Sequence, residues 1–329
     1  MTADRLPLIE VRQLSKDFPA KSKTFMKPRT AVHAVDGVSF SINEGETLGL
    51  VGESGCGKST LGRVILRLIP ATAGRVIYRG EDILSYPDKK MWQARKKLQI
   101  IFQDPYNSLN PRMVVEELVG APLDVYKTVP AKERRNKILS VLEDVGLGEQ
   151  HLHRYPHEFS GGQQQRIGIA RALILEPEFI VCDEPVSALD VSVRAQVLNL
   201  MQELQKKRGL TYLFISHDLS VVRRISNRVA VMYLGRIVEM AERRELYEDP
   251  LHPYTKALIS AIPIPDTTHK RARQAPAGDI PNPFAPPSGC HFHTRCPYAD
   301  EKCSRCSPEL SEVGKNHWTA CHYPMHNKM

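Results

Sequence analysis

Two adjoining stretches of sequence decide the fold: Thr47-Leu48-Gly49-Leu50-Val51 and, directly after it, Gly52-Glu53-Ser54-Gly55-Cys56-Gly57-Lys58-Ser59-Thr60. The first is a short apolar run, which is typical of a strand buried on both faces. The second fits G-x-x-x-x-G-K-[ST], the phosphate-binding loop that joins a strand to a helix. In such loops backbone N–H groups surround phosphate oxygens, Lys58 reaches the terminal phosphates, and the Ser59 hydroxyl coordinates Mg²⁺. We therefore predict that residues 52–60 bind the phosphates of a nucleotide.

Similar apolar runs alternate with amphipathic stretches along the rest of the chain as far as residue 250. The runs at 99–102, 179–182 and 211–215 predict further strands of a largely parallel sheet. Between the last two, residues 192–207 carry apolar side chains at helical spacing: Val197, Leu200, Met201 and Leu204. Residues 229–239 predict a hairpin that turns at Leu234-Gly235. The fold class is therefore predicted to be α/β.

Composition excludes several classes of protein. The 329 residues are 42% hydrophobic and 25% charged, as in soluble globular proteins. Uncharged apolar stretches such as 229–234 are far shorter than the roughly 20 residues that cross a bilayer, and the N-terminus resembles no secretory leader. We expect a cytosolic chain. The excess of Lys and Arg over Asp and Glu, 45 − 37 = +8, is scattered, so short basic clusters such as 132–135 and 270–273 predict solvated faces and no nucleic-acid partner.

The composition changes near Pro250. A proline-rich run at 276–287 precedes five of the seven cysteines, which fall in the last 40 residues. We predict one domain over residues 1–250 and a small cysteine-containing domain over 251–329, with a helical link at 254–261.

Two carboxylates close the run at 179–182 and complete the predicted nucleotide site. Asp183 would stand at the carboxyl end of a strand and hold Mg²⁺, through water. Glu184 would polarise the attacking water. Many strands end in acidic residues, so Asp183 and Glu184 indicate a nucleotide site only in combination with the phosphate-binding loop.

The segment Phe159-Ser160-Gly161-Gly162-Gln163 precedes a helical stretch and lies upstream of Asp183. It resembles the signature Leu-Ser-Gly-Gly-Gln of ATP-binding cassette (ABC) ATPases, with Phe159 in place of the leucine. Ser160 and the glycine amides at a helix N-terminus suit a γ-phosphate. The resemblance implies an ABC-type fold, with a RecA-like core, an antiparallel β subdomain and a helical subdomain, and it implies ATP with Mg²⁺ as ligands.

Further motifs follow in the order of this family. Gln103 matches the glutamine that senses Mg²⁺ and the attacking water, residues 187–190 match the D-loop, and His217 matches the histidine that contacts the γ-phosphate. Glu184, His217 and Gln103 are thus the implied catalytic residues, and Phe18 is the candidate that stacks on adenine, although a long insertion at 20–30 follows it. The implied ATP-binding set is Phe18, Gly52, Glu53, Ser54, Gly55, Cys56, Gly57, Lys58, Ser59, Thr60, Gln103, Ser160, Gly161, Gly162, Gln163 and Asp183, with Ser59, Gln103 and Asp183 on Mg²⁺.

Other segments resemble one branch of the family. Residues 106–112 are similar to the segment that peptide-class importers present to their membrane subunits. His252-Pro253-Tyr254-Thr255, with the cysteine region behind it, resembles the ATP-binding subunits of dipeptide and oligopeptide permeases, and residues 154–157 resemble the F-type subunit among them. The resemblance implies a peripheral subunit on the cytoplasmic face of the membrane. Its implied partners are a second cassette, more often a D-type subunit than another copy, two transmembrane subunits and, indirectly, an extracytoplasmic peptide-binding protein. Nickel and glutathione importers use similar ATPases, and a non-transport ABC ATPase acting on nucleic acid or ribosomes is the alternative from another class.

The cysteines near the C-terminus predict a metal centre. Cys290, Cys296, Cys303 and Cys321 are separated by five, six and 17 residues, and a reducing cytosol disfavours disulfides. The resemblance implies a [4Fe–4S] cluster on these four residues. Structural zinc is one alternative, because Cys306, His291, His293, His317 and His322 are spare donors, and thiols without a metal are the other. Cys56 and Cys182 are expected to be small buried residues instead.

Overall fold

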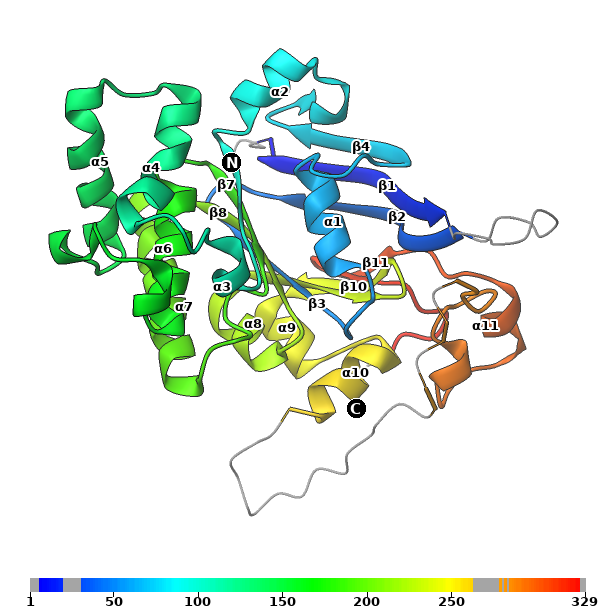
Figure 1. Ribbon diagram of the computed structural model, residues 1–329. Coiled ribbons are helices and arrows are strands. Elements are labelled where there is room, and N and C mark those ends of the chain that lie inside the picture. Colours follow the sequence, from blue (N-terminus) through cyan, green and yellow to red (C-terminus); the bar gives the residue numbers. More distant parts are fainter. Residues whose placement is uncertain (1–5, 20–30, 263–277, 280, 283, 326–329) are drawn as a thin grey trace, which may run out of the picture. The chain divides into compact units, whose positions relative to one another are not determined.

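The computed structural model describes residues 6–19, 31–262, 278–279, 281–282 and 284–325 (Figure 1). The insertion at 20–30, the basic cluster at 270–273 and part of the proline-rich run lie outside the described residues. The chain divides into two units. Unit 1 comprises the described residues up to Ile42, Thr47–Leu84, and the described residues from Ser216 onward; unit 2 comprises Asn43–Glu46 and Ser85–Ile215.

Unit 1 contains an antiparallel sheet in the order β2-β1-β4-β5. Its strands are β1 (Ile9–Pro19), β2 (Ala31–Ile42), β4 (Ala73–Tyr78) and β5 (Glu81–Asp82). Ile9, Val11 and Leu14 are the buried residues of β1, and a register shift between Val11 and Leu14 interrupts the strict alternation of a strand with one covered face. Helix α1 (Lys58–Ile65) packs against β1 and β2.

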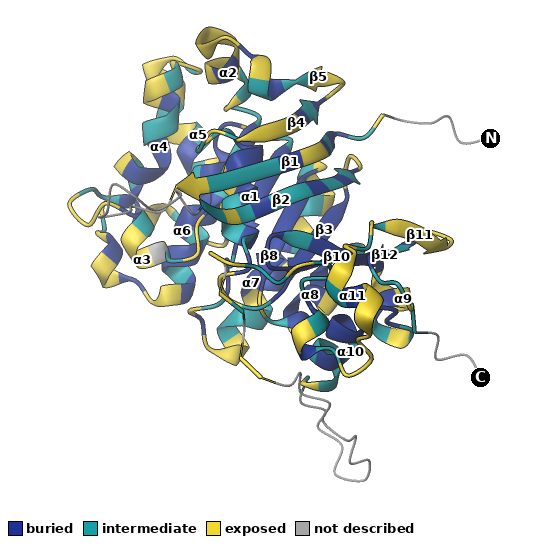
Figure 2. Ribbon diagram, turned by 90° about the vertical axis from the view of Figure 1, so that its right-hand side faces the viewer, coloured by how far each residue is buried: buried dark blue, intermediate teal, exposed yellow. Residues whose placement is uncertain are grey.

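The second group of strands in unit 1 begins with the predicted strand β3 (Thr47–Val51), all five residues of which are buried (Figure 2). β3 pairs in parallel with β9 (Arg228–Tyr233), which forms a hairpin with β10 (Arg236–Glu242). The predicted turn is confirmed: Leu234 and Gly235 both have positive φ, 41° and 84°, the conformation that tight hairpin turns require. Helices α8 (Leu219–Ile225) and α9 (Arg243–Glu248) contact β3 and β10 respectively.

Unit 2 contains three parallel strands, β6 (Leu98–Ile101), β7 (Phe179–Asp183) and β8 (Thr211–Ser216), although Ser216, the last residue of β8, is counted with unit 1. They match the predicted runs to within one residue at each end. The predicted helix between the last two is α7 (Val191–Arg208), and Val197, Leu200, Met201 and Leu204 are its buried residues together with Leu198. Gly209, with a φ of 65°, ends the helix in the left-handed conformation that glycine adopts readily.

The remaining helices of unit 2 are α2 (Asp88–Ala94), α3 (Pro105–Ser108), α4 (Val115–Tyr126), α5 (Ala131–Asp144) and α6 (Gly161–Leu173). The last three pack against one another, and α6 also contacts β6 and α7. Residue patterning alone predicted α6 but neither α4 nor α5; the helical subdomain came only from the family resemblance.

The C-terminal region joins unit 1 and does not form a unit of its own, so the predicted small domain is not confirmed. The predicted helical link is α10 (Pro253–Ser260); a 3₁₀ turn (His293–Arg295), α11 (Glu301–Arg305), β11 (Ser311–Gly314) and β12 (His317–Thr319) follow. β12 pairs with β10. The buried Glu239 of β10 accepts hydrogen bonds from the backbone N–H groups of Leu251 and His252, and one of its carboxylate oxygens lies 2.7 Å from Nε2 of His317. Among the described residues, no helix is both long and apolar enough to cross a membrane.

Candidate functional site

The predicted phosphate-binding loop connects β3 to α1 in unit 1, as its motif requires. Gly57 precedes the first residue of the helix and has a φ of 107°. A Cβ atom at Gly57 would lie 1.9 Å from the carbonyl oxygen of Ala34, so both the conformation and the space there require glycine. The loop is therefore shaped by its backbone surroundings.

Lys58 lies within this loop with only 4% of its surface exposed. Its Nζ donates hydrogen bonds to the carbonyl oxygens of Gly52 and Glu53, at 2.8 and 2.9 Å. The carbonyls hold the ammonium group among the loop residues, where terminal phosphate oxygens would offer stronger, charge-assisted partners. Ser59 and Thr60 follow on the first turn of α1 and are half-buried. Cys56, which also belongs to the loop, is buried, and burial raises the pKa of its thiol.

Glu53 connects this loop to the C-terminal region. Both oxygens of its carboxylate accept hydrogen bonds from the guanidinium of Arg295, at 2.8 and 3.1 Å. Its backbone N–H donates to the hydroxyl of Tyr254, at 3.0 Å. Sequence reasoning placed Glu53 in the loop but missed Arg295 and Tyr254, because no local pattern predicts a contact between residues more than 200 positions apart.

Gln103, Asp183 and Glu184 lie in unit 2, at the carboxyl ends of neighbouring parallel strands. Asp183 is the last residue of β7 and is 1% exposed, whereas Glu184 is half-buried. The side-chain amide of Gln103 donates a hydrogen bond to Oε2 of Glu184, at 3.0 Å. The structure thus brings two of the three predicted catalytic residues into contact.

The backbone of Glu184 is unusual. Its φ of 47° is in the left-handed region, which costs free energy in a residue with a side chain. Its N–H donates to the carbonyl oxygen of Ile215 at 3.0 Å, which holds the residue in that conformation. Strain of this kind concentrates at functional sites, which agrees with the catalytic role predicted for Glu184.

The signature residues form the N-terminus of α6 in unit 2. Ser160 is the N-cap: its hydroxyl accepts from the N–H of Gln163, and the Gln163 side chain accepts from the N–H of Ser160. Gly161 is exposed, and Gly162 is buried where a Cβ atom would lie 2.3 Å from Val193. The capping box leaves Ser160 exposed at the positive end of the helix dipole, the position that suits an anion.

The two other predicted ATP contacts belong to unit 1. His217 is exposed and directly follows β8. Phe18 lies on β1 with 39% of its surface exposed, and the ammonium group of Lys16 is 5.0 Å from its ring centre. An exposed aromatic ring on a strand is able to stack on a base.

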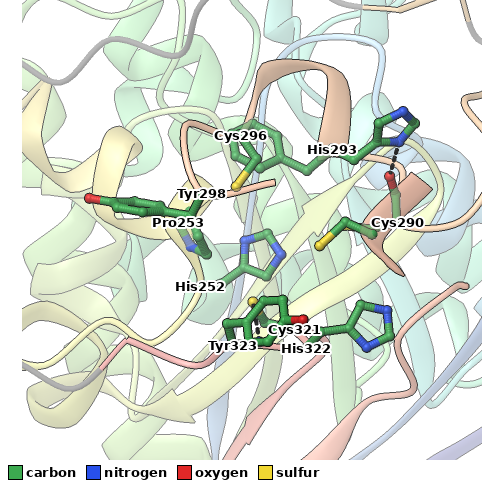
Figure 3. A pocket seen from close by; sticks show the side chains of 11 residues that line it. His252, Pro253, Cys290, His293, Cys296, Tyr298, Cys321, His322 and Tyr323 are labelled. Atoms are coloured by element: carbon green, nitrogen blue, oxygen red, sulfur yellow. Dashed lines mark hydrogen bonds between the residues drawn. The ribbon is translucent and has the colours of Figure 1, made fainter. Parts of the chain in front are cut away.

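The four predicted metal-binding cysteines converge. Cys290, Cys296, Cys303 and Cys321 all line one pocket, together with His252 and His322. Figure 3 shows the sulfur atoms of Cys290, Cys296 and Cys321 facing the same space. Cys306, by contrast, is exposed and does not line the pocket. Cys182 is fully buried in β7, as predicted.

Burial sets the protonation of these four thiols. It raises the pKa of each, and that of Cys321 to about 11, helped by the other three cysteines nearby. A metal would therefore displace protons on binding. Within the described residues, no group of three or more Cys, His, Asp or Glu side chains is placed so that it could hold a metal ion.

Comparisons with known proteins define the class. A family model described as "ABC transporter" matches residues 35–187, and one described as "Oligopeptide/dipeptide transporter, C-terminal region" matches residues 238–303. Two solved ATP-binding cassettes resemble the fold. The first is cbiO1 from Clostridium perfringens, with a TM-score of 0.64 and 28% identity over 74% of this chain and 91% of that one. The second is the cassette MJ0796 bound to ADP and Pi, with a TM-score of 0.63 and 29% identity over 72% and 99%. The fold is that of an ABC ATPase.

Proteins of similar sequence show which branch of the ABC ATPases the chain belongs to. The chain is 55% identical over 321 residues to YkfD of Bacillus subtilis strain 168, covering 97% of this chain and 96% of that one. It is 51% identical to the oligopeptide transport ATP-binding proteins AppF of the same organism (97% and 98% covered) and OppF of Haemophilus influenzae (95% and 96%). The chain belongs to the family of ATP-binding subunits of oligopeptide and dipeptide ABC transporters.

Proposed function

We propose that this chain binds and hydrolyses ATP to energise the import of dipeptides or oligopeptides. The observation that carries the proposal is the match along almost the whole chain, C-terminal region included, to oligopeptide transport ATP-binding proteins. The local geometry supports the ATPase part: the loop encloses Lys58, and Glu184 is held by Gln103 and by a strained backbone.

The roles proposed for the residues follow from their chemistry. Lys58 and the loop amides bind the phosphates. Ser59 and Gln103 would supply oxygen ligands for the Mg²⁺ that accompanies ATP, and Asp183 would hold the ion through water. Glu184 accepts a proton from the attacking water, while Gln103 orients the Glu184 carboxylate. His217 contacts the γ-phosphate, and Phe18 stacks on adenine. Ser160 and Gly162 complete the ATP site of a second cassette.

We propose further that residues 1–250 form the ATPase part and that residues 251–329 form a distinct functional region. The chain would pair with a related cassette of the D type in preference to a second copy of itself. The pair would bind two transmembrane subunits on the cytoplasmic face of the membrane, and an extracytoplasmic binding protein would deliver the peptide.

The four converging cysteines are proposed to hold a [4Fe–4S] cluster. Four thiols around one pocket support it, because such a cluster takes one thiolate at each of four iron corners. Structural zinc is the second candidate, because sites built from four cysteines, or from three cysteines and a histidine, are also normal for zinc.

Metal analysis tests this part of the proposal. The anaerobically purified chain is expected to carry about four irons and four acid-labile sulfides, with visible absorption. Cys303→Ser should remove most of the iron, whereas Cys306→Ser, which alters an exposed thiol outside the pocket, should not. One zinc per chain, or iron that survives Cys303→Ser, would contradict the cluster and leave the ATPase proposal intact.

Uptake assays test the transport proposal. A strain lacking the gene should lose uptake of labelled dipeptides or longer peptides and regain it with the wild-type gene, but not with Glu184→Gln. If the strain loses uptake of nickel or glutathione and not of peptides, the transported substrate is different but the transport role stands. Intact uptake of all four, together with nuclease-sensitive association of the chain with ribosomes or DNA, would overturn the transport role.

A further inference from the structure

A carboxylate inside a phosphate-binding loop requires an explanation. Glu53 is the second residue of the loop, and a negative charge there opposes the binding of anionic phosphates. The structure shows how this charge is compensated: the guanidinium of Arg295 donates to both carboxylate oxygens in the bidentate geometry of strong charge-assisted pairs. Only 7% of the Arg295 side chain and 23% of the Glu53 side chain are exposed, so solvent screens the pair weakly.

The side chain, the backbone N–H and the backbone carbonyl of Glu53 each form a hydrogen bond. Its side chain accepts from Arg295, its N–H donates to the hydroxyl of Tyr254, and its carbonyl oxygen accepts from Nζ of Lys58. One residue of the loop therefore contacts both Lys58, the proposed phosphate-binding lysine, and two residues of the C-terminal region. All of these residues lie in unit 1.

Arg295 is itself held by a buried aromatic cluster formed by Tyr233, Tyr254 and Phe292. The rings of Tyr233 and Tyr254 have centres 4.6 Å apart, and each is 5.3 Å from the ring of Phe292. The hydroxyl of Tyr233 accepts a further bond from Arg295 at 3.4 Å. Phe292 and Arg295 belong to the turn between Cys290 and Cys296, so the cysteine region itself presents the guanidinium to the loop.

We propose that Arg295 is a positioning residue of the nucleotide site, which neutralises the carboxylate of Glu53 and so makes MgATP affinity depend on the C-terminal region. The inference rests on the proposed role of the loop in binding ATP. Arg295 acts through Glu53 and touches no phosphate.

Binding of MgATP to the purified full chain tests the inference. Arg295→Gln leaves the Glu53 charge unpaired, and affinity is expected to fall by roughly tenfold. Adding Glu53→Gln removes that charge, so the double variant should regain most of the lost affinity. This rescue separates neutralisation from a merely structural role, because a lost contact is not restored by removing its partner.

The controls make the outcomes distinct. Arg305→Gln removes an equal charge from an exposed arginine of the same region that pairs with Glu301, and should leave affinity unchanged.

If Arg295→Gln fails to fold, as judged by thermal unfolding, Glu53→Gln alone carries the test, and its affinity for MgATP should rise at least twofold over that of the wild type. Unchanged affinity in Arg295→Gln, no rescue in the double variant, or no gain in Glu53→Gln would each overturn the inference. Lys58→Ala distinguishes this failure from that of the proposed function: if it too binds MgATP normally, the loop is not the phosphate site.

Discussion

Replacement of Glu184 by Gln is expected to lower ATP hydrolysis by about 10²- to 10⁴-fold, the range typical of a lost general base, while MgATP still binds. The amide has nearly the same shape and still accepts the hydrogen bond from Gln103, but it takes no proton from water. The backbone bond from Glu184 N–H to Ile215 does not involve the side chain, so the substitution leaves it intact. The loss should therefore appear in turnover and not in affinity.

Single-turnover and steady-state phosphate release by the assembled transporter would measure this effect. Glu178→Gln is a suitable control, because Glu178 immediately precedes the other end of β7 and pairs with Lys97 on the surface. Turnover by Glu184→Gln that equals that of the control would show that another group activates the water.

Replacement of Lys58 by Ala is expected to weaken MgATP binding by about 10- to 100-fold, the worth of one or two charge-assisted hydrogen bonds. Lys58 is almost fully enclosed by the loop. Its removal would take a hydrogen-bond donor away from the phosphates and also from the carbonyl oxygens of Gly52 and Glu53. Some of the effect would therefore come from a less ordered loop. Hydrolysis by the assembled complex should fall in parallel.

Equilibrium binding of a fluorescent ATP analogue to the isolated chain would measure this loss. Arg63→Ala removes the same charge from an exposed position on the same helix, α1, and should bind as wild type. Equal affinity in Lys58→Ala and Arg63→Ala would contradict the phosphate-binding role of residues 52–60.

Much of the fold could be predicted from local sequence, because its signals are local. Strands such as β3 and β7 are continuous apolar runs, and the loop after β3 needs glycine at fixed positions. The hairpin turn at Leu234-Gly235 and the apolar face of α7 were likewise predicted from a few adjacent residues. The helices α4 and α5 were not predicted from local sequence, because no motif marks them. The family resemblance implied a helical subdomain but did not say at which residues its helices begin and end.

In the candidate site too, the residues that belong to local motifs could be predicted and the contacts between distant residues could not. Motifs predicted Lys58, Gln103 and Glu184, and the structure adds the bond between the last two. The pair of Glu53 with Arg295 escaped prediction, because 241 residues separate them and an arginine before a cysteine has no distinctive pattern. The cysteines were predicted to converge and do so, but spacing alone did not determine which metal they bind.

ATP hydrolysis at this chain is expected to drive peptide import. Transport into proteoliposomes that contain the purified complex tests this, with the binding protein and a labelled peptide on one side and MgATP on the side of the ATPase subunits. We predict peptide accumulation against its gradient with the wild-type chain and none with Glu184→Gln. Accumulation that continues at the wild-type rate with Glu184→Gln would contradict the account.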